Sequence, residues 1–214
     1  MDYNGVCYEN CGDGLTAYGY WNDDIYEIDI PDEIDGIPVV QIESGAFRSL
    51  KNLEAVWIGK NVTLIESEAF ADCPCLQSVE IASPEIELDS YVFSSCEKLK
   101  RFYAAGIVSL SSGVFARCKN LEEFTGKIDS LYRSVFALCK ALKGNLQFAK
   151  EVYHFSGDAF RGECGITDLY FPGSINKYYN MSADNQSLVF HCNENSNICE
   201  LAYEGYNVVV QEVS

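Results

Sequence analysis

Cysteine and histidine are the residue types in this chain that could support nucleophilic or metal chemistry. The sequence holds 10 Cys and only two histidines, His154 and His191. A Cys–His pair needs the imidazole beside the thiol in the fold, yet neither histidine lies in a stretch typical of a strand-to-helix nucleophile turn. The sequence also lacks a phosphate-binding Gly-rich loop and a His-Glu zinc motif. We predict no catalytic residues and no enzyme activity.

The spacing of the cysteines does not favour a metal site either. Cys73-Pro74-Cys75 sets two thiols close together, but no second pair stands at a distance typical of zinc ligands. We therefore predict no metal site and no cofactor.

An Ala-Phe or Val-Phe dipeptide recurs along the chain. Its spacing indicates the fold that positions the cysteines and histidines. The spacings are 23, 23, 22, 21 and 24 residues between the phenylalanines Phe47, Phe70, Phe93, Phe115, Phe136 and Phe160. Five residues before them stand Ile42, Ile65, Leu88, Leu110, Leu131 and Phe155, and six after them stand Leu53, Leu76, Leu99, Leu121, Leu142 and Ile166. A period in this range is typical of a solenoid.

Each repeat also contains a short segment in which apolar and variable residues alternate. Examples are 56–58 (VWI), 79–81 (VEI), 102–104 (FYA) and 169–171 (LYF), and residues 28–30 (IDI) form the first. Such alternation predicts a strand with one buried face. One strand per repeat, always in the same direction, would build a parallel sheet along a curved solenoid.

The run Ile28–Val39, followed by repeats of the form I-x-x-x-A-F-x-x-C-x-x-L-x-x-V-x-I, resembles the BspA-type leucine-rich repeat family. The closing stretch 197–210 is similar to an ending common in that family. The resemblance implies an α/β-type repeat solenoid: a right-handed leucine-rich-repeat superhelix with a parallel β-sheet on the concave face, mostly strand and loop, with little helix. It also implies a secreted or surface-attached protein that adheres to host proteins or to other cells. Departures from the frame occur at Lys143–Asn145 and over 173–187.

We divide the chain into an N-terminal cap at 1–24, leucine-rich repeats at 25–190 and a C-terminal cap at 191–214. The repeat region would hold about six to seven units of 21–24 residues. Caps are expected because the first and last rungs of a solenoid would otherwise expose their apolar faces.

Four cysteines share one position of the repeat, three residues after the phenylalanine: Cys73, Cys96, Cys118 and Cys139. Parallel side chains on rungs about 4.8 Å apart cannot form an unstrained disulfide, so we predict reduced, buried thiols. Two pairs outside this column could form local disulfides that staple the caps, Cys7 with Cys11 and Cys192 with Cys199. Disulfides would favour an extracellular location, and reduced thiols a cytoplasmic one.

Charge is unevenly distributed in this acidic chain, whose formal net charge is -17. Residues 1–47 hold eleven acidic and no basic side chains, whereas 98–150 holds ten basic ones. Basic clusters usually form a solvated face, which we favour over a docking surface for an acidic partner. The net charge argues against a nucleic-acid partner. We predict no transmembrane segment, and the N-terminus does not resemble a signal peptide, so either a leader was removed or the protein is cytoplasmic.

Side chains alternate across a strand, so the central residue of each segment should point to the open face of the sheet. The predicted binding column extends on the order of 34 Å. It consists of Asp29, Trp57, Glu80, Tyr103, Thr125, Gln147, Tyr170 and Val189, with flanking positions at Glu27, Ala55, Ser78, Arg101, Glu123 and Asp168. The aromatics and Arg101 are residue types that dominate protein interfaces, although aromatics also suit strands for purely structural reasons.

We interpret the chain as a non-catalytic protein-interaction module of the cell surface or secreted space, using the concave sheet for adhesion or recognition. Two alternatives stay open at this point. One is a structural spacer within a larger surface protein, and the other is a cytoplasmic scaffold.

Overall fold

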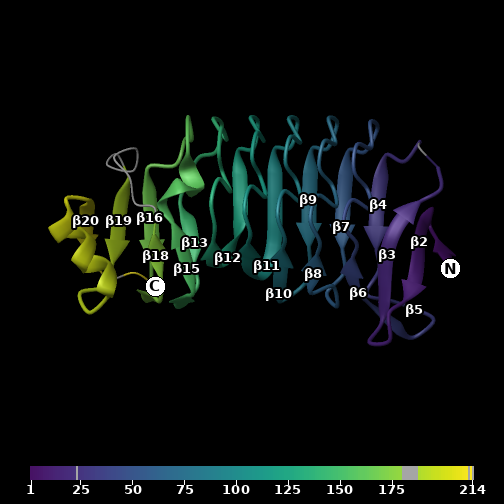
Figure 1. The fold of residues 1–214 in the computed structure, drawn as a ribbon, viewed down its shortest axis with the longest axis horizontal. Helices are drawn as coiled ribbons and strands as arrows, with labels where there is room; N and C mark the ends of the chain where they lie inside the picture. Colours follow the sequence, from purple (N-terminus) through teal and green to yellow (C-terminus); the bar gives the residue numbers. More distant parts are fainter. Residues whose placement is uncertain (23, 180–187, 212, 214) are drawn as a thin grey trace.

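The protein is a β-solenoid of stacked parallel strands, described by a computed structural model for residues 1–22, 24–179, 188–211 and 213. Figure 1 shows the rungs side by side along the long axis, with the first and last elements at opposite ends. The elements are β1 (Asp2–Tyr3), β2 (Val6–Asn10), β3 (Leu15–Tyr20), β4 (Glu27–Ile30), β5 (Glu33–Ile34), β6 (Ile37–Ile42), β7 (Ala55–Ile58), β8 (Leu64–Ile65), β9 (Ser78–Ile81), β10 (Glu85–Leu88), β11 (Arg101–Leu110), β12 (Glu123–Leu131), β13 (Leu146–Phe148), β14 (Glu151–Val152), β15 (His154–Ser156), η1 (Gly157–Phe160), β16 (Asp168–Phe171), β17 (Ser174–Ile175), β18 (Tyr178–Tyr179), β19 (Val189–Cys192), η3 (Asn197–Glu204) and β20 (Asn207–Val210).

One ladder of parallel strands is formed by the alternating segments of the repeats. It runs β4, β7, β9, β11, β12, β13, β16, β19 and β20. The apolar residues of each segment face inward, and Ile28, Val56 and Val79 are no more than 3% exposed. The predicted repeat solenoid with a parallel sheet is confirmed.

A second parallel ladder was not predicted from the sequence. It runs β3, β6, β8, β10, β11, β12, β15 and β18, so a repeat contributes two strands rather than one. In β11 and β12 the two strands are continuous. The expectation of one strand per repeat was wrong because several strands of this ladder, such as Leu64–Ile65, are too short to show alternation. β17 and β18 pair with β14 and β15, so the irregular stretch starting at 173 keeps the stacking at least to Tyr179.

The recurring phenylalanines form one stack through the core. Successive rings from Phe47 to Phe160 have centroids 5.1–5.9 Å apart and planes within 19° of parallel. Phe102 and Phe124 pack against this stack edge-on from the first ladder. The core is therefore continuous from rung to rung, as stacked repeats require.

A turn of constant backbone conformation brackets each phenylalanine of the first five repeats. The residues two positions before and two positions after it have φ between 58° and 70°. They are Gly45, Ser49, Glu68, Asp72, Tyr91, Ser95, Gly113, Arg117, Ser134 and Leu138. The turns still bond to each other, because the amide of each phenylalanine donates to a carbonyl of the next rung, as from Phe115 to Val135 at 3.0 Å. Buried peptide groups are thus satisfied outside the strands as well.

The four cysteines of the repeat column are buried and unbridged, as their shared position predicts. Each thiol also makes a hydrogen bond that the sequence did not reveal. The sulfur donates to the phenylalanine carbonyl of the preceding rung, as from Cys118 to Phe93 at 3.1 Å and from Cys139 to Phe115 at 3.1 Å. Burial raises the pKa of Cys118 from 9.0 to about 12.

The burial of Cys118 predicts a loss of stability in alkali. An unfolded thiol ionises near its ordinary pKa of 9.0, whereas Cys118 keeps its proton to about 12. The stability that this thiol contributes is therefore complete below pH 9 and falls between pH 9 and 12, by up to about 1.4 kcal/mol per pH unit. Urea unfolding at pH 8, 9 and 10 should show a shallower decline for Cys118→Ala than for the wild type. The control Cys11→Ala, at an exposed thiol, should decline like the wild type, and equal slopes for all three proteins would contradict this assignment.

The predicted N-terminal cap, 1–24, contains a β-hairpin that extends the second ladder. β2 pairs antiparallel with β1 and β3, and β3 lies parallel to β6. Tyr20 stacks on Phe47 with ring centroids 6.3 Å apart, so the hairpin covers the first ring of the stack. The structure does not favour the possible disulfide between Cys7 and Cys11. Cys7 lies in strand β2 and Cys11 just beyond its end, so about 13 Å of extended chain separates them, too far for a disulfide.

At the other end the parallel ladder continues past residue 190, where the sequence predicted the repeats to stop. β19 spans that boundary and pairs with β20, and η3 between them buries Ile198 and Leu201. The Ser196 hydroxyl accepts a hydrogen bond from the Ile198 amide at the start of η3. The sulfurs of Cys192 and Cys199 lie 3.3 Å apart as free thiols, so a disulfide there stays a prediction. Within the described residues, no helix has the length and apolar character needed to cross a membrane.

Candidate functional site

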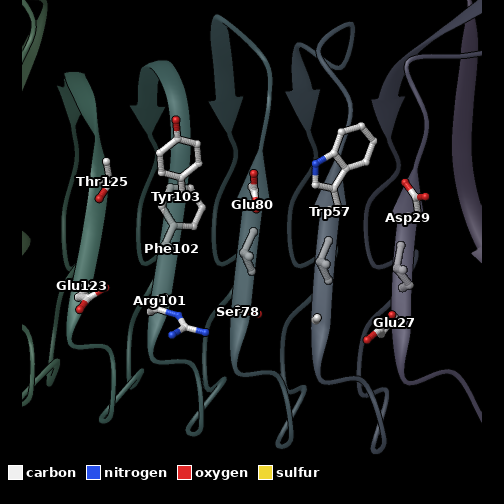
Figure 2. A pocket seen from close by; sticks show the side chains of 14 residues that line it. Glu27, Asp29, Trp57, Ser78, Glu80, Arg101, Phe102, Tyr103, Glu123 and Thr125 are labelled. Atoms are coloured by element: carbon white, nitrogen blue, oxygen red, sulfur yellow. The ribbon is translucent and has the colours of Figure 1, made fainter.

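A cleft of about 660 Å³ lies on the exposed face of the first ladder, over β4, β7, β9, β11 and β12. Two rows of side chains line it, and Figure 2 shows them one above the other along the strands. One row consists of Asp29, Trp57, Glu80, Tyr103 and Thr125. The other row lies two residues earlier on each strand and consists of Glu27, Ala55, Ser78, Arg101 and Glu123.

The parallel register of the strands sets both rows. Trp57 pairs with Asp29 on one side and with Glu80 on the other, and Tyr103 pairs with Glu80 and Thr125. Asp29, Trp57, Glu80 and Tyr103 each stand between two buried apolar neighbours, so strand alternation directs them outward. The structure thus brings together five members of the predicted column, together with five of the predicted flanking positions.

The charge of the cleft is strongly negative. Glu27, Asp29, Glu80 and Glu123 supply four carboxylates, against the single guanidinium of Arg101. In the part of the chain that the structure describes, none of these five side chains forms an ion pair. Elsewhere, carboxylates of adjacent rungs do pair with cations, as Glu97 does with Lys119 at 2.6 Å. The negative electrostatic potential of the cleft is therefore not reduced by internal ion pairs, and it would act on a charged ligand.

Two large aromatic side chains stand in this negative cleft. Trp57 is 36% exposed and Tyr103 is 46% exposed. Figure 2 shows the two rings on either side of the shorter Glu80 side chain, with Arg101 near the other end of its strand. Paired strands of the ladder hold both residues, so their positions are set before a ligand binds.

The remaining predicted residues, Gln147 and Tyr170, do not continue this row. A register shift in the pairing of β11 with β12 separates the partners Tyr103–Thr125 from the partners Ile107–Lys127. Beyond the shift, Lys127 rather than Thr125 pairs with Gln147, and Gln147 pairs with Tyr170. The prediction of one straight column from Asp29 to Tyr170 was wrong because three residues of β11 oppose only Gly126 there.

A second cleft of about 510 Å³ lies beyond the register shift. It differs from the first in charge, because Lys127 and Lys150 line it together with Gln147, Tyr170 and Gln211. Sequence reasoning missed Lys127 and Gln211 as members of this face. Lys127 follows Gly126 in a segment that was assigned a single outward residue, Thr125, although the alternation continues through it.

The register also corrects the prediction for Val189, the outermost member of the predicted column. Val189 pairs with Asp168, and the partner of Tyr170 is His191. The His191 ring lies flat on the Tyr170 ring with centroids 4.2 Å apart, and its Nε2 is 2.8 Å from an Asp168 carboxylate oxygen. Hydrogen bonds from the Thr167 hydroxyl and from His191 lower the pKa of Asp168. Tyr170 is thus partly covered, unlike Trp57 and Tyr103.

The surroundings of the histidines and cysteines are those of residues with a structural role. His154 Nδ1 lies 3.0 Å from the Tyr179 hydroxyl, and its ring packs beside Tyr132. Among the residues that the structure describes, neither histidine hydrogen-bonds a thiol, and no cluster of His, Cys, Asp or Glu could hold a metal ion.

Two parallel ladders, a repeated phenylalanine and a leucine frame define a leucine-rich-repeat solenoid. A family model described as the BspA type leucine-rich repeat region, in 6 copies, matches residues 15–143 and 104–189. The chain belongs to this family, and the resemblance predicted from its motifs is confirmed.

Comparison with curated proteins gives no match. Among solved structures, a leucine-rich repeat protein of T. pallidum is 22% identical, with 67% of this chain and 90% of that chain covered and a TM-score of 0.39. A leucine-rich cell surface protein of Faecalibacterium prausnitzii A2-165 is 16% identical, covering 90% and 72%, with a TM-score of 0.46. The pneumococcal vaccine antigen PcpA is 12% identical, covering 100% and 98%, with a TM-score of 0.35.

Proposed function

We propose that this protein is a non-catalytic interaction module that binds another protein through the cleft on β4, β7, β9, β11 and β12. The observation that carries the proposal is the pair of exposed rings, Trp57 and Tyr103, held on two strands of the ladder with β9 between them. They stand among charges that form no ion pair within the described residues. Interfaces concentrate their binding energy in such aromatic anchors. Membership of a leucine-rich repeat family is in keeping with this use, because stacked repeats present extended recognition surfaces.

We further propose that the protein acts in adhesion or recognition at the cell surface or outside the cell. This part of the proposal rests on the family resemblance, which implies secreted or surface-attached proteins. The partner would then be a protein of a host or of another cell.

A capture experiment tests the proposed site. The protein would be immobilised and exposed to extracellular-matrix and cell-surface extracts, alongside a Trp57→Ala/Tyr103→Ala variant. We expect the variant to lose at least about nine-tenths of the captured partner, because truncating an aromatic anchor costs on the order of 2 kcal/mol or more.

The matched control is Trp21→Ala/Tyr91→Ala, which removes two rings that are 68% and 46% exposed and do not line the cleft. This control should capture the partner as well as the wild type does. Equal capture by all three proteins would place the binding surface elsewhere, and no capture by the wild type would favour a structural spacer.

A further inference from the structure

We propose that the cleft recognises a cationic side chain, best an arginine, in an extended basic segment of the partner, with the cation between Trp57 and Tyr103 and over the Glu80 carboxylate. This inference rests on the proposed function, because it requires the cleft to be a protein-binding site. It adds the chemical class of the ligand and the position of its charge.

The strand register provides the geometry. Trp57, Glu80 and Tyr103 stand at paired positions of three consecutive strands. Neighbouring strands lie about 4.8 Å apart, so the two aromatic positions are separated by about 10 Å with Glu80 midway. A cation above Glu80 would therefore lie about 5 Å from the backbone position of each aromatic residue. From there a long side chain of the partner can reach the outward face of either ring, where cation–π attraction acts within roughly 6 Å of the ring centroid. In Figure 2, Glu80 is the labelled side chain that lies between the two rings.

The charges of the cleft select a cation over an anion or a neutral group. Asp29 stands beside Trp57, on the side away from Glu80, and adds a second carboxylate in the same row. Arg101, the one cation of the cleft, lies in the other row between Ser78 and Glu123. Its charge repels a basic side chain from that row and thereby favours the row that holds the two rings.

The chemistry of the three side chains favours arginine over lysine. A guanidinium is planar and can lie against an aromatic face while it donates two hydrogen bonds to one carboxylate. Its weaker hydration also makes transfer from water into a partly enclosed cleft less costly than for an ammonium group.

The length of the acidic region limits the length of the basic segment. From Asp29 to Thr125 the row crosses four strand gaps, about 19 Å in total, which an extended chain spans with about six residues. Beyond Thr125 the face becomes basic, since Lys127 and Lys150 line the next cleft. The cleft therefore fits a short segment with one or two cations better than a long polycation.

Binding of defined peptides tests the inference. We would measure fluorescence anisotropy with a labelled hexapeptide of Ser that carries a single Arg at its third position, using the full chain at low ionic strength. Two further peptides carry citrulline or Glu in place of Arg, so that shape and charge are separated. We expect the Arg peptide to bind at least about tenfold more tightly than the citrulline peptide, the loss of about 1.4 kcal/mol expected for one desolvated cation–π and carboxylate contact.

Variants of the protein localise the effect. Glu80→Gln and Trp57→Ala should each weaken binding of the Arg peptide about tenfold, and added salt should weaken it for the wild type. Glu87→Gln is the matched control, because Glu87 is an exposed carboxylate on β10 that does not line the cleft. Equal loss in Glu87→Gln and Glu80→Gln, or equal binding of the Arg and citrulline peptides, would overturn the inference.

Capture of the natural partner by Glu80→Gln separates this inference from the proposed function. If the Trp57→Ala/Tyr103→Ala variant loses the partner and Glu80→Gln keeps it, the cleft is a binding site that does not read a cation there. If both variants keep the partner, both proposals fail. Loss in both, with Glu87→Gln unaffected, supports both.

Discussion

Replacing Phe115 with alanine is expected to lower the free energy of unfolding by about 3–5 kcal/mol. Phe115 lies in the middle of the phenylalanine stack, with ring centroids 5.6 Å from Phe93 and 5.7 Å from Phe136. Its ring also meets Phe102 and Phe124 edge-on. The substitution would therefore leave a cavity bounded by four phenylalanine rings of the same core.

Urea denaturation followed by circular dichroism measures this loss. Tyr153→Ala is the control, because this ring is 49% exposed and should contribute about 1 kcal/mol or less. A Phe115→Ala variant that unfolds at the same urea concentration as Tyr153→Ala would show that the phenylalanine stack does not carry the core.

Replacing Gly106 with alanine is expected to destabilise the fold by about 3 kcal/mol, at the upper end for a substitution that overfills a packed site. A Cβ at this position would stand 1.9 Å from the carbonyl oxygen of Pro84. That oxygen is also the acceptor for the Ile107 amide at 2.9 Å. Relief of the clash would require the backbone of β11 to move away from the preceding rung, and the hydrogen bond would be lost with it.

Gly19→Ala provides the control for this substitution. A Cβ at Gly19 would meet nothing nearer than the carbonyl oxygen of Ala46 at 3.9 Å, with no left-handed backbone to strain it. The two variants should therefore differ in thermal midpoint, with Gly106→Ala lower by several degrees and Gly19→Ala close to the wild type. Similar midpoints would contradict the close approach of the rungs at Pro84.

The repeat and its core were predictable because they depend on residue types at a fixed period. Leu53, Leu76 and Leu99 keep their register with the phenylalanines in sequence and are all fully buried in the fold. The second ladder was not predictable in the same way. Its strands β8 and β18 are two residues long and bury at most one side chain, Ile65 in β8, and a single apolar residue specifies neither a strand nor its direction.

The site was predicted only in part, for a related reason. Alternation indicates which side chains point outward within one strand, and it placed Trp57, Glu80 and Tyr103 on one face. It does not indicate how a strand pairs with the next rung. Gly126 has a φ of 152° and lies where the register shifts, so the sequence could not show that Lys127, rather than Thr125, faces Gln147.

Because the strands stack in parallel, the number of rungs can change during evolution without a change in the cleft. Among the described residues, strands of the first ladder pair with the rung before and the rung after, and the cleft occupies five consecutive strands. Duplicating or deleting a rung between β13 and β20 would leave every pair from Asp29 to Thr125 in place. A gene built from such units can lengthen or shorten its product by unequal recombination while the residues of the cleft are inherited unchanged.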